Sequence, residues 1–296
     1  MRNFDAPPPR RRMINRRQFV AGSGATLAAL SLGNTPLPPI ALDPGGQATQ
    51  GGWLRGSVQP GTRALALDGK PVPVSFDNKF LIAFDRDAGP ATQLVATLAD
   101  GSSVALPLTI APRAWAIERV NVAKRPGGLP DAEFLRIREG ELTRIRAARA
   151  LDTGAQGWRQ DFIRPAPGRF SGRFGSQRIY KGEPGSYHSG LDIAGGAGTT
   201  YVAPADGVVV LAATTPFTLE GHLLILDHGN GLNSAFLHAS QLLVREGAIV
   251  LQNEPLGTIG MTGRATGPHL HWAVMWQRSR LDPILLLHDL VSSATR

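Results

Sequence analysis

Near its C-terminal end the chain reads Gly267-Pro268-His269-Leu270-His271-Trp272. The residues that follow Pro268 are apolar or favour β-structure, and the three residues from Thr266 to Pro268 are typical of a turn, so the pattern predicts a β-strand. Side chains alternate between the two faces of a strand, so His269 and His271 are expected to share one face. Such a pair could hold a metal ion, or one histidine could bind a metal while the other carries a proton.

Two upstream segments could supply further ligands. The first is His188-Ser189-Gly190-Leu191-Asp192, in which an imidazole and a carboxylate four residues apart would lie on one face of a helix or a strand. Gly190 makes a helix unfavourable here. His188, Asp192 and one of the two late histidines would form a set of two nitrogens and one oxygen, which suits a catalytic zinc that keeps a position for water. The second segment places His238 on an apolar strand, Phe236–Ser240.

Composition limits the possible classes of protein. The chain has 296 residues, which suggests about two domains, and 42% of them are hydrophobic, enough for a core. It contains no cysteine, so disulfides, thiolate metal sites and cysteine nucleophiles are excluded. The net charge is +8, but six arginines and one aspartate lie in the first 17 residues and the rest of the chain carries +3. Nucleic-acid binding is therefore disfavoured.

The N-terminal arginines have a more specific interpretation. Asn15-Arg16-Arg17-Gln18-Phe19-Val20 resembles a twin-arginine export signal, and the modestly apolar run of residues 21–32 after it is too short and too rich in glycine and serine to span a membrane. We expect residues 1–35 to be a signal peptide, the mature chain to lack an integral membrane segment, and the protein to be periplasmic. The alternative is a disordered basic tail.

The rest of the chain predicts a mainly β protein. Residues 36–51 are rich in proline and glycine and read as a linker. Residues 52–113 alternate short apolar runs with turns and predict a small β-sandwich. Residues 128–152 predict a solvated connecting helix, on which Glu133 could pair with Arg136 and Glu141 with Arg144. Residues 165–290 predict an antiparallel sheet, and the absence of a βαβ alternation excludes dinucleotide-binding and P-loop folds.

Three segments together resemble the active-site motifs of the lysostaphin/LytM-type zinc metalloendopeptidases. They are Tyr187–Ile193, Ser234–His238 and Gly263–Trp272, and they occur in the family's order within about the last 125 residues. The resemblance implies a compact antiparallel sheet with zinc at the floor of a groove. By motif position, the residues that match zinc ligands are His188, Asp192 and His271. Those that match the histidines orienting the attacking water and stabilising the transition state are His238 and His269.

The second motif departs from the family pattern, because Phe236 stands where tyrosine is usual and Ala239 where leucine is usual. If the strand alternates regularly, Phe236 faces the same side as His238, and a hydrogen bond near the groove would be absent. The remaining histidines, His222, His228 and His288, are expected to be structural. Arg178 and Tyr187 could line the groove.

Two functions from different classes remain open at this point. The first is a zinc endopeptidase that cleaves the peptide stems of bacterial peptidoglycan at their cross-links, with a D,D-endopeptidase as the favoured type. The second is a non-hydrolytic protein that keeps the fold and activates another cell-wall hydrolase. The complete set of ligand residues favours the first. A regulatory protein partner is compatible with either.

Overall fold

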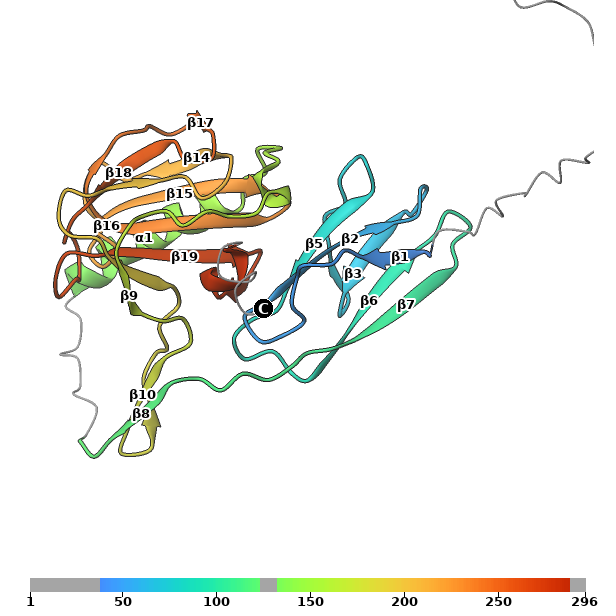
Figure 1. The fold of residues 1–296 in the computed structure, drawn as a ribbon, viewed down its shortest axis with the longest axis horizontal. Coiled ribbons are helices and arrows are strands. Elements are labelled where there is room, and N and C mark those ends of the chain that lie inside the picture. Colours follow the sequence, from blue (N-terminus) through green and yellow to red (C-terminus); the bar gives the residue numbers. More distant parts are fainter. Residues whose placement is uncertain (1–37, 123–131, 288–296) are drawn as a thin grey trace, which may run out of the picture. The chain divides into compact units, whose positions relative to one another are not determined.

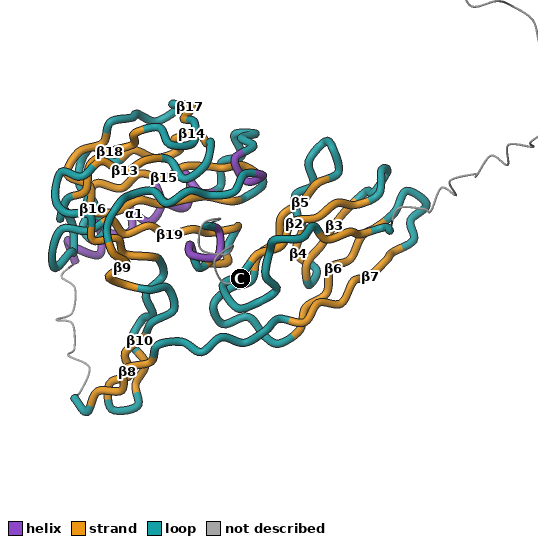
Figure 2. The backbone as a smooth tube through the Cα atoms, viewed as in Figure 1, coloured by secondary structure: helices purple, strands orange, loops and turns teal. Residues whose placement is uncertain are grey.

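The computed structural model describes residues 38–122 and 132–287 (Figure 1). The expected signal peptide and His288 lie outside this part of the chain. Strands dominate what is described (Figure 2), so the prediction of a mainly β protein with an antiparallel sheet is confirmed. None of the helices in the two described ranges has the length and apolar content needed to cross a bilayer.

The N-terminal β region consists of two antiparallel sheets. The first has the strand order β1 (Ile40–Leu42), β2 (Trp53–Val58), β5 (Lys79–Ala83). The second has the order β4 (Lys70–Pro71), β3 (Ala64–Leu67), β6 (Ala91–Thr97), β7 (Ser103–Thr109). Phe80, Leu81 and Leu94 are fully buried, which gives these sheets a hydrophobic core.

The expected linker, residues 36–51, contains a β-strand, so the predicted boundary between linker and β region at residue 52 is wrong. Strand β1 lies inside it and pairs with β2, with Ile40 opposite Val58. A strand of three residues beside several prolines carries almost no local signal, because its stability comes from pairing with a distant strand. The β region therefore begins before residue 52.

A small third sheet is built from one strand before helix α1 in the chain and two strands after it. Strand β8 (Ile117–Val120) pairs in parallel with β10 (Gln177–Tyr180), and β10 pairs with β11 (Glu183–Pro184). Helix α1 (Ala132–Arg149) lies within the range expected for a helix. Short 3-10 turns, η1 (Gly157–Arg159) and η2 (Pro283–Leu286), flank the large sheet.

The large C-terminal sheet follows the strand order β17-β14-β15-β16-β19-β12-β9, with β18 beside β16, β13 beside β18 and β20 beside β19. Its strands are β9 (Arg169–Gly172), β12 (Leu191–Ala194), β13 (Thr200–Val202), β14 (Gly207–Ala212), β15 (His222–Gly229), β16 (Leu232–Leu242), β17 (Ile249–Val250), β18 (Pro255–Ile259), β19 (Leu270–Trp276) and β20 (Ser279–Leu281). Every pairing in it is antiparallel.

Helix α1 packs on this sheet instead of standing in solvent. Its Ala148 is buried with Ile225, Ala235 and Ala273 in one hydrophobic cluster, and Figure 1 shows the helix running along the strands. Phe236 and Trp272, which alternate with these residues, belong to the cluster on the other face. The expected picture of a solvated connector is therefore wrong for the face of α1 that contacts β14 and β15.

Of the two ion pairs expected on the helix, one forms and the other does not. Glu133 pairs with Arg136 as predicted, at 2.7 Å. Glu141, however, is buried and pairs with Arg138 at 2.9 Å, whereas Arg144 approaches Glu246 at 3.9 Å. Glu141 pairs with Arg138 and not with Arg144 because its carboxylate is buried against Thr218, within reach of Arg138, whereas the Arg144 side chain is half exposed.

Candidate metal centre

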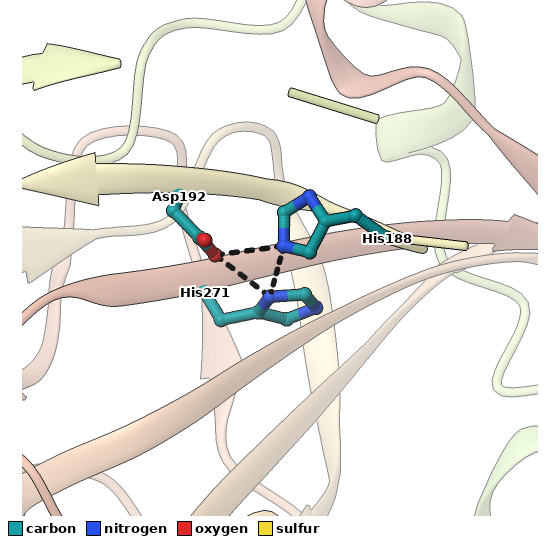
Figure 3. Close-up of side chains that lie close together, drawn as sticks. All are labelled: His188, Asp192 and His271. Carbon is teal, nitrogen blue, oxygen red and sulfur yellow. Dashed lines mark hydrogen bonds and ion pairs between the residues drawn. The ribbon is translucent and has the colours of Figure 1, made fainter. Parts of the chain in front are cut away.

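His188, Asp192 and His271 converge in the C-terminal sheet (Figure 3). Asp192 on β12 lies directly opposite His271 on β19, because these two strands are antiparallel neighbours in that register. His188 lies in the segment that leads into β12. The side-chain atoms that these three residues offer as ligands all lie within 4.8 Å of one another.

The donor atoms face a common point. Asp192 Oδ1 lies 3.0 Å from His188 Nε2 and 2.8 Å from His271 Nδ1, and the two nitrogens are 3.1 Å apart. The other nitrogen of His188, Nδ1, donates to the Arg173 carbonyl oxygen at 3.1 Å. This hydrogen bond selects the tautomer in which the Nε2 lone pair of His188 points into the cluster.

The arrangement fits a small divalent cation. Three donors on a tetrahedral zinc at about 2.0–2.1 Å lie roughly 3.3 Å from one another, close to the separations in this cluster. Two imidazole lone pairs and a carboxylate so near one another repel unless a proton or a cation lies between them. One carboxylate and two imidazoles are also ligand types that zinc accepts.

The electrostatic environment favours the ligand forms of Asp192 and His271. Burial raises the pKa of Asp192, but hydrogen bonds with His188 and His271 outweigh it and hold that pKa well below its usual range. Burial lowers the pKa of His271, although Asp192 opposes the shift, so a neutral imidazole is favoured. An ionised carboxylate and a neutral imidazole are the species that bind a metal.

The His271 ring fits beside position 190 because Gly190 has no side chain. A Cβ atom at position 190 would lie 2.6 Å from His271 Nε2 and 2.7 Å from the Trp272 carbonyl oxygen. Any other residue would therefore displace the ring or the strand. The glycine in His188-Ser189-Gly190-Leu191-Asp192 serves close packing between β12 and β19.

His238 and His269 lie beside the cluster. His269 Nδ1 donates to the Gly267 carbonyl oxygen at 2.8 Å, and its Nε2 is 3.7 Å from Asp192 Oδ1. His238 Nδ1 donates to the Thr262 carbonyl oxygen at 2.8 Å, and its ring centroid is 5.0 Å from that of His269. These hydrogen bonds select, for a neutral ring, the tautomer with the proton on Nδ1 and the lone pair on Nε2. The structure thus brings together all five residues singled out from the sequence.

His238 reaches this position through irregular backbone. Strand β16 pairs Phe236 with Leu224 but Ala239 with His222, so it contains an extra residue at this point, a β-bulge. The φ angle of His238 is +66°, an uncommon value for a residue other than glycine.

This bulge overturns the argument that Phe236 and His238 share a face. Phe236 is fully buried and stacks on Tyr201, with ring centroids 5.5 Å apart, in the core on the face opposite His271. Leu237, which lies directly opposite His271 on the neighbouring strand, is on the His271 face of the sheet instead. The missing tyrosine hydroxyl at position 236 would therefore not have faced the metal centre.

The other described histidines make structural contacts. His222 Nδ1 donates to the Ala213 carbonyl oxygen at 2.9 Å. His228 lies inside β15 and is fully buried. Its Nδ1 donates to the Asp206 carbonyl oxygen and its Nε2 accepts from Ser234 Oγ, both at 2.8 Å. Burial lowers the pKa of His228 to about 4.

A cleft of 1320 Å³ opens beside His188. Its lining includes Tyr187 and Arg178, as expected, and also strand β8 and Arg264, which the sequence interpretation missed. Arg178 pairs with Glu118 of β8 at 2.6 Å, and Tyr187 contacts Arg280 at 3.3 Å. Strand β8 escaped notice because its partner β10 lies some 60 residues away in the chain.

Comparisons with known proteins find similarity in the part of the chain that holds these residues. Residues 186–283 match the model of peptidase family M23. Over 88 residues the chain is 39% identical to peptidoglycan DD-endopeptidase ShyA of Vibrio cholerae, covering 30% of this chain and 20% of ShyA. Over 97 residues it is 34% identical to the DD-carboxypeptidase/endopeptidase Mpg of Neisseria meningitidis, covering 33% of this chain and 22% of Mpg. The chain thus spans about a fifth of the length of these curated relatives.

A solved structure extends the similarity beyond the motif region. A Pseudomonas aeruginosa protein described as a candidate M23 peptidase superposes with a TM-score of 0.62 at 27% identity, over 81% of this chain and 95% of that one. The matched segment holds His188, Asp192, His238, His269 and His271, whose side chains meet on the large sheet. The C-terminal sheet of this chain is therefore a domain of peptidase family M23.

Proposed function

We propose that this protein is a zinc-dependent endopeptidase that hydrolyses peptide cross-links of bacterial peptidoglycan, of the D,D-endopeptidase type. The observation that carries the proposal is the approach of His188 Nε2, Asp192 Oδ1 and His271 Nδ1 to within 3.1 Å of one another, with His238 and His269 beside them. The substrate class rests on relatives described as peptidoglycan DD-endopeptidases.

In this proposal His188, Asp192 and His271 hold the metal. A bound zinc ion would lower the pKa of water and polarise the scissile carbonyl group. Asp192 contributes the negative charge that offsets part of the ion's charge, and the Arg173 carbonyl oxygen keeps the His188 ring in its ligand orientation.

The two other histidines assist the hydrolysis in different ways. Peptide hydrolysis needs a group that accepts a proton from the attacking water and a group that returns one to the leaving amine. We assign His269 both to accept the proton from the water and to return it to the leaving amine, because its Nε2 lies 3.7 Å from Asp192 Oδ1 of the ligand set. His238, whose ring centroid lies 6.3 Å from that of His271, orients the attacking water, because its Nε2 can accept a hydrogen bond while its Nδ1 donates to the Thr262 carbonyl oxygen. Burial lowers the pKa of His238, which favours its neutral, hydrogen-bonding form.

The location follows from the substrate. Peptidoglycan lies outside the cytoplasm, and the twin-arginine-like segment at residues 15–20 offers an export route to the periplasm. The alternative of a non-hydrolytic activator gains no specific support, since each group required for hydrolysis lies within reach of the others.

The decisive experiment is digestion of purified cross-linked muropeptides by the protein, with product masses determined. We expect cleavage of the D,D bond, its loss with a chelator and its return when zinc is added. A protein that binds one zinc per chain yet leaves every cross-linked fragment intact would contradict the enzymatic proposal. A protein without stoichiometric zinc would favour the activator.

A further inference from the structure

We propose that helix α1 is part of the catalytic apparatus, with Arg138 and Glu141 as positioning residues that hold His238 through the loop of residues 217–221. The inference rests on the proposed role of His238 in hydrolysis. It adds residues that lie outside the M23 match and 97 to 100 positions before His238 in the chain.

The first step runs from the helix to the loop. Arg138 forms a fork on Glu220, with Nη1 donating to Oε2 at 2.6 Å and Nη2 donating to Oε1 at 2.7 Å. Glu141 accepts from the Thr218 backbone N–H at 2.6 Å and from Thr218 Oγ1 at 2.7 Å. Arg138 also donates to Glu141 at 2.9 Å, so the two helix residues act as one clamp.

This clamp is shielded from solvent. The side chains of Arg138, Glu141 and Glu220 are 15%, 9% and 16% exposed, respectively. Bidentate, charge-assisted hydrogen bonds are shorter and more directional than single ones. Burying such charges adds little net stability compared with an apolar contact of the same shape, so the main consequence of the clamp is a defined geometry for the loop.

The second step runs from the loop to His238. The Glu220 carbonyl oxygen accepts from the His238 backbone N–H at 2.9 Å. The loop is closed by reciprocal backbone hydrogen bonds between Phe217 and Gly221, at 2.8 and 3.0 Å, so it moves as a unit. A shift of Glu220 would therefore move the backbone of His238.

The loop also touches the segment that orients the His238 ring. Gly221 packs against Thr262 so closely that a Cβ atom would overlap it. The carbonyl oxygen of Thr262 accepts from His238 Nδ1, and its hydroxyl accepts from the His222 backbone N–H. His238 is thus held at its backbone by Glu220 and at its ring by Thr262.

The conformation of His238 explains why such support is needed. A φ angle of +66° in a residue with a side chain is unfavourable and persists only where neighbouring groups fix it. Without the clamp, loop 217–221 could relax, and the bulge in β16 would lose one of its two anchors. His188, Asp192 and His271 make no hydrogen bond to this loop in the described residues, so metal binding should not depend on it.

The test compares the zinc-loaded variants Arg138→Met, Arg138→Lys and Arg136→Met with the unmodified protein. We expect Arg138→Met to lower kcat by about tenfold or more, because small displacements of a reacting group can cost up to ~100-fold. KM and zinc affinity should stay within about twofold. Arg138→Lys should recover part of the loss, since it keeps the charge without the fork. Arg136→Met is the matched control, because its ion pair with Glu133 is exposed and touches no loop.

Two further measurements separate positioning from simple stabilisation. In a His238→Ala background, Arg138→Met should cause no additional loss of kcat, because the group it positions is absent. Histidine ring signals in NMR spectra of the zinc-loaded protein should change for His238 and remain for His188 and His271. This second readout needs no activity, so it tests the inference even if the chain hydrolyses no peptidoglycan.

Clear outcomes would overturn the proposal. They are an unchanged kcat together with unchanged His238 signals in Arg138→Met, or an equal loss of kcat in the presence and absence of the His238 ring. If Arg138→Met does not fold, Glu220→Gln replaces it, because it keeps the shape of the side chain and weakens the fork. The same criteria then apply to that variant.

Discussion

Two of the proposed metal ligands, Asp192 and His271, are positioned by a different kind of structure from the two remaining histidines of the proposed site, His238 and His269. Asp192 and His271 face each other across regular antiparallel strands, so the strand register alone brings them together. His238 depends on a β-bulge and a φ angle of +66°, and His269 lies just before β19 begins. From this difference we predict that metal binding and proton transfer can be lost separately by mutation.

The largest effect is expected from removing a ligand. His188→Ala, Asp192→Ala and His271→Ala should each lower zinc affinity by more than ~100-fold, because even outer hydrogen-bond partners of metal ligands are worth 10–100-fold. Activity should disappear in parallel. Metal analysis after dialysis, together with muropeptide digestion, checks both properties. Retention of stoichiometric zinc by any of the three variants would remove that residue from the ligand set.

Removing the proposed proton acceptor should affect turnover alone. His269→Ala should keep zinc bound and lower kcat by about 10²–10⁴-fold, the usual contribution of a positioned acid or base. Circular dichroism and metal analysis serve as controls for folding and zinc content. Loss of zinc in this variant would show that the roles of His269 and His271 have been exchanged.

A smaller effect is expected from crowding the ligand set. Gly190→Ala would place a Cβ atom 2.6 Å from His271 Nε2 and should weaken zinc binding by about 10–100-fold. Gly267→Ala is the matched control, because a Cβ there meets no atom within 4 Å. Equal zinc affinities in the two variants, measured by chelator competition, would show that the close packing at Gly190 is not required.

The five residues that the structure brings together could be singled out from the sequence, because their spacing matches a known set of motifs. It did not reveal the bulge at His238, since alternation is a local rule and the extra residue is visible only in the pairing of β16 with β15. The contact between Arg138 and Glu220 joins positions 82 residues apart, and nothing in either segment signals it. The prediction of a mainly β fold held because turn residues and alternating apolar runs are themselves local signals.

The smallest effect comes from His228, which lies outside the metal centre. Both of its nitrogens are satisfied inside the protein, unlike those of His238, and burial lowers its pKa to about 4. The unfolded chain binds a proton near pH 6.5 whereas the folded chain does not, so stability should fall as the pH drops from 6.5 to about 4. The loss has an upper limit of about 3 kcal/mol, at 1.36 kcal/mol for each pKa unit.

Denaturant unfolding across this pH range, in the unmodified protein and in His228→Gln, isolates the contribution. The variant carries no titrating group at this position, so its stability should depend less steeply on pH between 6.5 and 4. Identical slopes would mean that His228 has the same pKa in the folded and the unfolded chain. His228 would then no longer contrast with His238 as a histidine that affects stability alone. The contrast rests on hydrogen bonding, because both nitrogens of His228 are bonded inside the protein whereas Nε2 of His238 is left for a water or substrate.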